Sequence, residues 1–236
     1  MSNLTSAEKI ISELKKNRNS KIVEGMARFG INQETALGLS IPYLRKTAKE
    51  IGKNHELALT LWNSGIHEVR ILATMIDEIE KVTKMQMNNW VKDFNSWDLC
   101  DQCCNNLFGK TPFAIEKSFE WIKSEKEFVR RAGFVLMAVL SVHNKEMKDE
   151  EFIEYFPLIE KYSTDERNFV KKAVNWALRQ IGKRNSRLNK EAVLICEKLI
   201  QSDSKSAKWI GKDALKELTS EQIVKRLINK NRNQDF

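Results

Sequence analysis

Phe128-Val129-Arg130-Arg131-Ala132 recurs 41 residues later as Phe169-Val170-Lys171-Lys172-Ala173, and Trp209-Ile210-Gly211-Lys212 is a weaker third copy after 40 more. A period near 40 residues in paired helices is typical of HEAT and armadillo arrays. One such helix pair cannot bury its apolar face alone, so neighbouring pairs stack into a curved α-solenoid with a concave surface. The repeat therefore predicts an all-α, HEAT-like superhelix, with chance similarity between amphipathic helices as the alternative.

Helix-breaking residues are rare and stand where helices should begin or end. The chain has three prolines and nine glycines. Ser40 with Pro42 predicts the start of a helix that runs to Ile51, and Thr111-Pro112 predicts the start of another. Residues 29–39 lack a helical stripe and are expected to form an irregular loop or a short hairpin. Periodic stretches predict further helices over residues 4–16, 54–65, 67–79, 97–108, 126–141, 149–162, 165–182, 188–202, 206–218 and 220–230.

Positive charge is concentrated in the last third of the chain. The formal net charge is +8, yet residues 1–162 hold 23 Lys/Arg and 23 Asp/Glu. Residues 163–236 hold 17 Lys/Arg and 9 Asp/Glu, which is the whole excess. A one-sided basic segment favours a polyanionic partner such as nucleic acid, and a merely soluble basic surface is the alternative. The length fits a single domain over residues 1–236.

Equivalent positions of the repeats carry cations. Arg131, Lys172 and Lys212 share one place in their units, so stacked units would align them on one face. One helix also carries a stripe at i, i+4, i+7 and i+11, formed by Lys172, Trp176, Arg179 and Lys183. We expect that stripe to be solvated, although a tryptophan is more often buried. A basic concave face that contains an indole is suited to a phosphate backbone.

Trp97 and Asp101 are four residues apart and should share one helix face. Nearby cations would keep the carboxyl group ionised. Such a pair can stabilise a developing cation, the indole through its π-face and the carboxylate through its charge. The alternative is that Trp97 belongs to the core and Asp101 is an ordinary surface acid.

The sequence gives no sign of a metal or nucleotide site. Cys100, Cys103 and Cys104 lie within one predicted helix without a second cysteine pair or a nearby histidine, so we interpret them as packing residues. The chain has no Walker loop and no dinucleotide fingerprint. No apolar run approaches the roughly 18 residues of a membrane span, and residues 1–16 lack the apolar stretch of a signal peptide. We therefore expect a cytoplasmic protein.

Several segments together resemble the AlkD family of HEAT-repeat DNA alkylation repair glycosylases. Their order and approximate spacing match that family, and the similarity spans nearly the whole chain. The matching segments are Met26-Ala27-Arg28-Phe29, Leu37-Gly38-Leu39 with Pro42 and Arg45, Ser96-Trp97-Asp98-Leu99-Cys100-Asp101, Arg130-Arg131-Ala132, and Lys172-Ala173-Val174-Asn175-Trp176-Ala177-Leu178-Arg179.

The resemblance implies an active site. The family's catalytic aspartate falls on Asp101, and its two active-site tryptophans fall on Trp97 and Trp176. Its essential arginine, which would hold a phosphate, falls on Arg131, with the neighbouring Arg130 as the alternative.

One position departs from the family pattern. Phe29 stands where the family's prototype has a tyrosine, so a hydroxyl contact is lost. The residues that we expect to contact DNA are Phe29, Arg45, Arg130, Lys171, Lys172, Arg179, Lys183 and Lys212.

The reaction that the resemblance implies is hydrolysis of the N-glycosidic bond of a purine alkylated at N3 or N7. Asp101 would stabilise the oxocarbenium-like sugar and orient the attacking water, and the two indoles would hold the deoxyribose. Neither a metal nor an organic cofactor is implied. The partner would be double-stranded DNA, either alkylated or branched, and we expect a monomer in the bacterial cytoplasm.

Two other function classes compete with a glycosylase. A structure-specific protein that binds branched or damaged DNA without chemistry would need the cations but not the carboxylate. A HEAT-type scaffold for proteins would not need the cations. Asp101 separates the first two classes, because a carboxylate in a basic groove repels DNA unless it serves the reaction.

Overall fold

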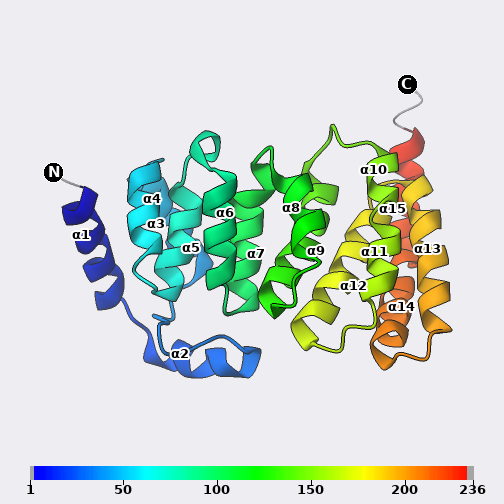
Figure 1. Cartoon of the computed structure of the whole chain (residues 1–236), viewed down its shortest axis with the longest axis horizontal. Helices are drawn as coiled ribbons and strands as arrows, with labels where there is room; N and C mark the ends of the chain where they lie inside the picture. The colour runs from blue at the N-terminus through cyan, green and yellow to red at the C-terminus, as the bar shows by residue number, and fades with distance from the viewer. Residues whose placement is uncertain (1–2, 233–236) are drawn as a thin grey trace. The chain divides into compact units, whose positions relative to one another are not determined.

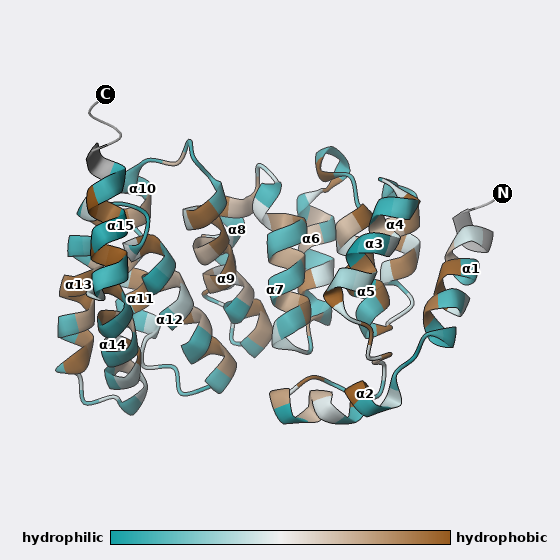
Figure 2. Cartoon of the chain, turned by 180° about the vertical axis from the view of Figure 1, so that it is seen from behind, coloured by the Kyte–Doolittle hydropathy of each residue, from teal (hydrophilic) through white to brown (hydrophobic). Residues whose placement is uncertain are grey.

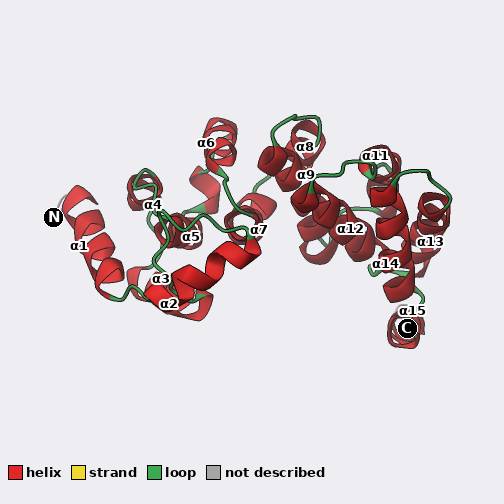
Figure 3. Ribbon diagram, turned by 90° about the horizontal axis from the view of Figure 1, so that it is seen from below, coloured by secondary structure: helices red, strands yellow, loops and turns green. Residues whose placement is uncertain are grey.

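The protein is all-helical, as predicted. A computed structural model describes residues 3–232 and shows helices joined by loops, with no strand among those residues (Figure 1; Figure 3). The chain divides into two compact units, Met1–Phe113 and Ala114–Phe236. The single domain expected over 1–236 also includes residues 1–2 and 233–236, which lie outside the described part. None of the described helices combines the length and apolar character needed to cross a membrane.

Capping residues set the helix ends of the first unit. The Ser40 hydroxyl accepts a hydrogen bond from the Tyr43 N–H at 3.4 Å, and Gly52 follows the last turn with φ of 78°. Two helices of seven residues, α2 and α6, lie where no helix was predicted, because two turns are too short to show a repeating stripe. The helices are α1 (Asn3–Lys16), α2 (Ser20–Met26), α3 (Ile41–Ile51), α4 (His55–Trp62), α5 (His67–Ile76), α6 (Lys84–Trp90) and α7 (Trp97–Asn106).

Short 3-10 turns join several helices of this unit. They are η1 (Ala27–Phe29), η2 (Ile79–Lys81), η3 (Val91–Asp93) and η4 (Phe108–Lys110). Residues 30–40 form the predicted irregular loop, and the hairpin alternative is wrong because these residues contain no strand. The core includes Trp62 and Trp90, whose rings stack with centroids 3.9 Å apart.

The second unit corrects two predictions. The helix expected over 149–162 is two helices, because Pro157 fits the first turn of α11 but cannot continue α10. The helix expected from Pro112 begins at Ala114, since the Thr111 hydroxyl donates back to the Phe108 carbonyl at 2.8 Å. The helices are α8 (Ala114–Trp121), α9 (Glu127–His143), α10 (Asp149–Ile153), α11 (Phe156–Tyr162), α12 (Asn168–Gly182), α13 (Ser186–Ile200), α14 (Lys205–Leu218) and α15 (Glu221–Arg232).

The helices that carry the repeated segments pack against one another. Helix α12 lies between α9 and α14 and contacts both. The rings of Phe128 and Phe169, which are equivalent in the repeat, have centroids 5.4 Å apart. Asn175 of α12 donates to the Ile210 carbonyl of α14 at 3.3 Å. Residues 129–141 of α9 are all buried, and Figure 2 shows apolar residues over most of this helix. The predicted stacking of repeats is therefore confirmed in this unit.

Candidate functional site

Helix α7 presents a half-buried tryptophan at its first position. The indole Nε1–H of Trp97 donates to the backbone carbonyl of Phe29 at 2.9 Å. The side chain of Phe29 is 65% exposed, so the 3-10 turn η1 holds an aromatic ring at the surface. Ser96 occupies the predicted N-cap position, but its side chain makes no capping hydrogen bond. The bond to Phe29 therefore fixes the indole where α7 begins.

The two carboxylates of α7 lie in different environments. Asp101 is half-buried and lies one turn after Trp97, on the same face. Asp98 accepts a hydrogen bond from His67 Nε2 at 2.8 Å. Burial alone would raise the pKa of Asp98, but the hydrogen bond and the charge of His67 outweigh it and lower that pKa. The hydrogen bond between Asp98 and His67 thus joins α7 to α5.

The histidine of this pair shifts in the opposite direction. Burial alone would lower the pKa of His67, but the hydrogen bond and charge of Asp98 outweigh burial and raise that pKa. The His67 side chain is 3% exposed. Both shifts favour the charged forms, so the two residues form an ion pair that joins α5 to α7.

A buried glutamate anchors the loop that follows η1. The carboxylate of Glu68 accepts hydrogen bonds from the N–H groups of Leu37 at 2.7 Å and Gly38 at 2.6 Å. Gly38 has φ of 73°, and a Cβ there would lie 2.4 Å from the Asn19 carbonyl oxygen. Sequence patterns did not single out Glu68; the available signal was an acid on the apolar face of its helix. Arg45, on α3 beyond this loop, is exposed.

Helix α12 of the second unit carries an indole beside a cation. Lys172 is exposed, and Trp176 lies one turn further on and is half-buried. The indole N–H of Trp176 lies 2.9 Å from the side-chain amide of Gln180, whose oxygen accepts the bond. Lys171 places its ammonium group 5.1 Å from the centre of the Trp209 ring, which is 40% exposed.

The lower half of the predicted stripe is ion-paired. Both Arg179 and Lys183 donate to the carboxylate of Glu217 on α14, with Lys183 at 2.6 Å. Burial alone would raise the pKa of Glu217, but the bonds from Lys183 and Arg179 lower it overall. The stripe therefore has the predicted register, yet a carboxylate compensates two of its cations. Lys212 on α14 is exposed.

Arg130 is enclosed by acids and an aromatic ring. Its guanidinium donates to Glu125 at 2.8 Å and to Asp165 at 2.7 Å, and lies 4.9 Å from the centre of the Tyr162 ring. Burial alone would raise the pKa of Asp165, but bonds from Arg167 and Arg130 lower it to about 2. Arg130 is therefore held in a local ion network.

Arg131 faces the neighbouring repeat. It is 5% exposed, and its Nη1 donates to the Phe169 carbonyl at 2.6 Å. The predicted alignment of Arg131 with Lys172 and Lys212 thus combines one buried arginine with two exposed lysines. The arginine ties α9 to α12, whereas the lysines face solvent.

A family model described as DNA alkylation repair enzyme matches residues 10–229. The chain belongs to the DNA alkylation repair enzyme family. The match covers both compact units and includes every residue assigned to the site from sequence. A comparison with curated protein sequences finds no match.

This member of the DNA alkylation repair enzyme family is also similar to a solved structure. That structure is described as a new family of proteins related to the HEAT-like repeat DNA glycosylases with affinity for branched DNA structures. The TM-score is 0.74 at 18% sequence identity, over 87% of this chain and 92% of the other. At this identity the likeness shows the fold, which is the HEAT-like repeat that the sequence predicted.

The cysteines of α7 lie in the core of the first unit. Cys100, Cys103 and Cys104 are buried. Burial raises the pKa of the Cys103 thiol well above its ordinary value, so that thiol is protonated. Within residues 3–232, no group of His, Cys, Asp and Glu side chains is arranged to hold a metal ion.

Proposed function

We propose that this member of the DNA alkylation repair enzyme family binds duplex DNA and releases purines alkylated at N3 or N7. The observation that carries the proposal is the arrangement of α7. Trp97 and Asp101 share a half-buried face, and the bond from Trp97 to Phe29 fixes the indole. The neighbouring acid, Asp98, accepts a hydrogen bond from His67. Asp101, which follows Trp97 by one turn on the same face, is the α7 carboxylate that we assign to the chemistry.

The proposed reaction needs only a carboxylate and an oriented water. An alkylated purine is cationic and leaves as a neutral base, taking the electron pair of the N-glycosidic bond. The sugar that remains is oxocarbenium-like, and Asp101 stabilises its positive charge. Water then forms a bond to C1′ and loses a proton to solvent. The face of Trp97 contacts the deoxyribose and adds cation–π stabilisation, and the family pattern assigns the same role to Trp176.

Side chains of the second unit hold the phosphate backbone in this proposal. Lys172 and Lys212 are exposed and supply charge directly. Lys171 and the Trp209 ring form a second contact surface on α12 and α14. Arg131 positions α12 through the Phe169 carbonyl, and the family pattern assigns it to the phosphate beside the lesion.

The remaining contacts are peripheral. In the first unit, Arg45 and the exposed ring of Phe29 contact the flanking backbone. Arg130, Arg179 and Lys183 must exchange carboxylate partners for phosphate, so each contributes less than Lys172.

The test is base release by the wild-type protein under single-turnover conditions. Duplexes of one sequence would carry 7-methylguanine, 3-methyladenine or no lesion, and abasic sites would be detected by alkaline strand cleavage. The proposal expects release from the alkylated duplexes only. A protein that binds tightly yet releases no base from either lesion would contradict it.

One observation favours a second candidate, a branched-DNA binder without chemistry. The solved structure with the same fold is described as having affinity for branched DNA. Competition between a four-way junction and an alkylated duplex distinguishes the two. Preference for the unmodified junction, together with no base release, would replace the glycosylase with this candidate.

A further inference from the structure

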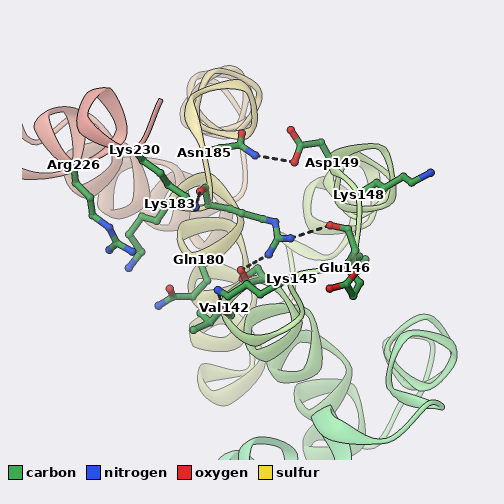
Figure 4. Close-up of a pocket in the computed structure, with 13 residues that line it drawn as sticks. Val142, Lys145, Glu146, Lys148, Asp149, Gln180, Lys183, Asn185, Arg226 and Lys230 are labelled. Atoms are coloured by element: carbon green, nitrogen blue, oxygen red, sulfur yellow. Dashed lines mark hydrogen bonds between the residues drawn. The ribbon is translucent and has the colours of Figure 1, made fainter. Parts of the chain in front are cut away.

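A cleft of about 730 Å³ lies in the second unit, at the carboxyl-terminal end of α12 (Figure 4). The carboxyl-terminal ends of α9 and α12 form its base, the connection from α9 to α10 forms one wall, and α15 forms the other. Two acids, Glu146 and Asp149, line it among the described residues. The basic residues that line it are Lys145, Lys148, Lys183, Arg184, Arg226 and Lys230. We name this the cationic cleft.

Carbonyl groups position several of these cations without neutralising them. Arg184 donates to the carbonyls of Ser141 at 3.0 Å and Met147 at 2.9 Å. Lys230 donates to the carbonyl of Arg184 at 2.6 Å, and Lys145 donates to that of Val142 at 2.6 Å.

The two acids of the cationic cleft offset part of this charge, since the charge of Asp149 alone would raise the pKa values of Arg184 and Lys230, but the cations outnumber the acids. Asp149 accepts a hydrogen bond from Asn185 at 2.8 Å, and Glu146 is exposed. Among the cations, Lys183 has Glu217 as its carboxylate partner. The cationic cleft therefore holds a net positive charge on two facing walls.

The cations of the cleft repel one another. Burial lowers the pKa of Lys230, and the charges of Lys145, Arg184 and Arg226 lower it further. Burial also lowers the pKa of Arg184. Like charges gathered in a hollow raise the local concentration of anions and are relieved when an anion binds.

The lining indicates which kind of anion fits. No aromatic side chain lines the cleft among the described residues, so a nucleobase would find no ring on which to stack. The groups present are ammonium and guanidinium groups, which recognise phosphate oxygens through charge and hydrogen bonds. A phosphate group without a stacked base matches this chemistry best.

The place of the cleft on α12 connects it to the proposed site. Gln180 and Lys183, which line it, lie four and seven residues after Trp176 and therefore share its face. Seven residues of α-helix span about 10 Å. Successive nucleotides of one DNA strand advance about 3.4 Å along the duplex axis, so a duplex whose axis runs along α12 would place about three nucleotides over this distance.

We propose that the cationic cleft binds a backbone phosphodiester of the DNA about three nucleotides from the damaged one. This inference rests on the proposed function, because the distance is counted from Trp176. The cationic cleft then acts as a second phosphate-binding site that fixes the position of the duplex along the protein. The cationic cleft binds the phosphate group and makes no base-specific contact.

The test removes one charge from each wall. Lys145→Gln and Arg226→Gln change exposed side chains, and Lys190→Gln removes an exposed charge on α13 that does not line the cleft. Each cleft variant should reduce the slope of log affinity against log salt by up to about one unit, whereas Lys190→Gln should leave it nearly unchanged.

A phosphate scan locates the contact. An uncharged methylphosphonate would replace one phosphate at a time on either side of a 7-methylguanine. The wild-type protein should lose affinity when the methylphosphonate stands at one position about three nucleotides away. The same methylphosphonate should change the affinity of Arg226→Gln only slightly, because that variant already lacks the contact.

The outcomes separate this proposal from the proposed function. Cleft variants that match Lys190→Gln, in a protein that still binds DNA and releases base, would overturn the cleft alone. A wild-type protein that neither binds the alkylated duplex nor releases base would overturn both.

Discussion

Helices α7 and α12 present the same spacing with opposite charge. In the first unit, Asp101 follows Trp97 by four residues, and in the second unit Trp176 follows Lys172 by four. Both indoles are half-buried beside a charged group. An indole face suits a sugar in either place, so the sign of the neighbouring charge decides the role. A carboxylate serves a cationic sugar, whereas an ammonium group serves a phosphate.

The largest expected effect is on the rate. If Asp101 stabilises the cationic sugar, Asp101→Asn should slow single-turnover base release by about 10²-fold or more. Asparagine is nearly isosteric, and matching melting curves would exclude a folding defect. A variant with full activity would remove Asp101 from the chemistry and break the comparison.

The neighbouring carboxylate should affect stability instead. Asp98→Asn leaves the buried His67 without its charge partner and should lower the free energy of unfolding by about 1.5 to 3 kcal/mol, the scale of a hydrogen bond to a charged group. Base release per folded molecule should change little. Chemical denaturation measures the first quantity, and a rate loss as large as that of Asp101→Asn would contradict this division of roles.

The stability effect should depend on pH with a defined sign. The raised pKa of His67 means that pairing stabilises the fold fully below the ordinary value of 6.5 and less as pH rises through the raised pKa. The lowered pKa of Asp98 means that its contribution is present above 3.8 and is lost as pH falls through the lowered pKa. The difference between wild type and Asp98→Asn should therefore be largest near about pH 5 to 6 and smaller at about pH 9. A difference that grows between about pH 6 and about pH 9 would contradict this pairing.

Local signals in the sequence predicted the fold well. The echo of residues 128–132 at 169–173 predicted stacked helices, because an apolar face with helical spacing must be covered. Ser40 and Gly52 marked the ends of α3, since caps act on their own turn. Helix α2 was missed because a two-turn helix shows no stripe.

Pairings between distant residues limited the prediction of the site. Glu217 compensates Arg179 and Lys183 from 38 and 34 positions away, and no local pattern indicates which cations a folded chain will pair. The same holds for His67 and Asp98, which are 31 positions apart. The sequence predicted which residues of α12 share one face. Which of their cations pair with a carboxylate became clear only from the folded chain.

A smaller effect should appear in the salt dependence of binding. Lys172→Ala or Lys212→Ala should each reduce the slope of log affinity against log salt by about one unit, because each is proposed to replace counterions at a phosphate. Fluorescence anisotropy over a salt series measures this slope, with Lys190→Ala as the control. Unchanged slopes in both variants would remove these lysines from the DNA surface.

The smallest effect should come from releasing paired cations. Glu217→Gln frees Arg179 and Lys183 from their carboxylate and should tighten DNA binding by about threefold, the scale of a partly exposed ion pair. Glu191→Gln, an exposed acid on α13, removes the same charge elsewhere. Equal effects of the two variants would mean that net charge alone controls binding.

The most direct measurement compares one variant of α7 with one variant of α12 in both reaction rate and DNA affinity. The saturated single-turnover rate and the Kd would be determined for Asp101→Asn and Lys172→Ala on one duplex carrying 7-methylguanine. We predict that Asp101→Asn loses rate and keeps or improves affinity, because a negative charge leaves a surface that holds phosphate. Lys172→Ala should lose affinity and keep the saturated rate. Loss of affinity in Asp101→Asn, or loss of the saturated rate in Lys172→Ala, would contradict the assignment of chemistry to α7 and of phosphate binding to α12.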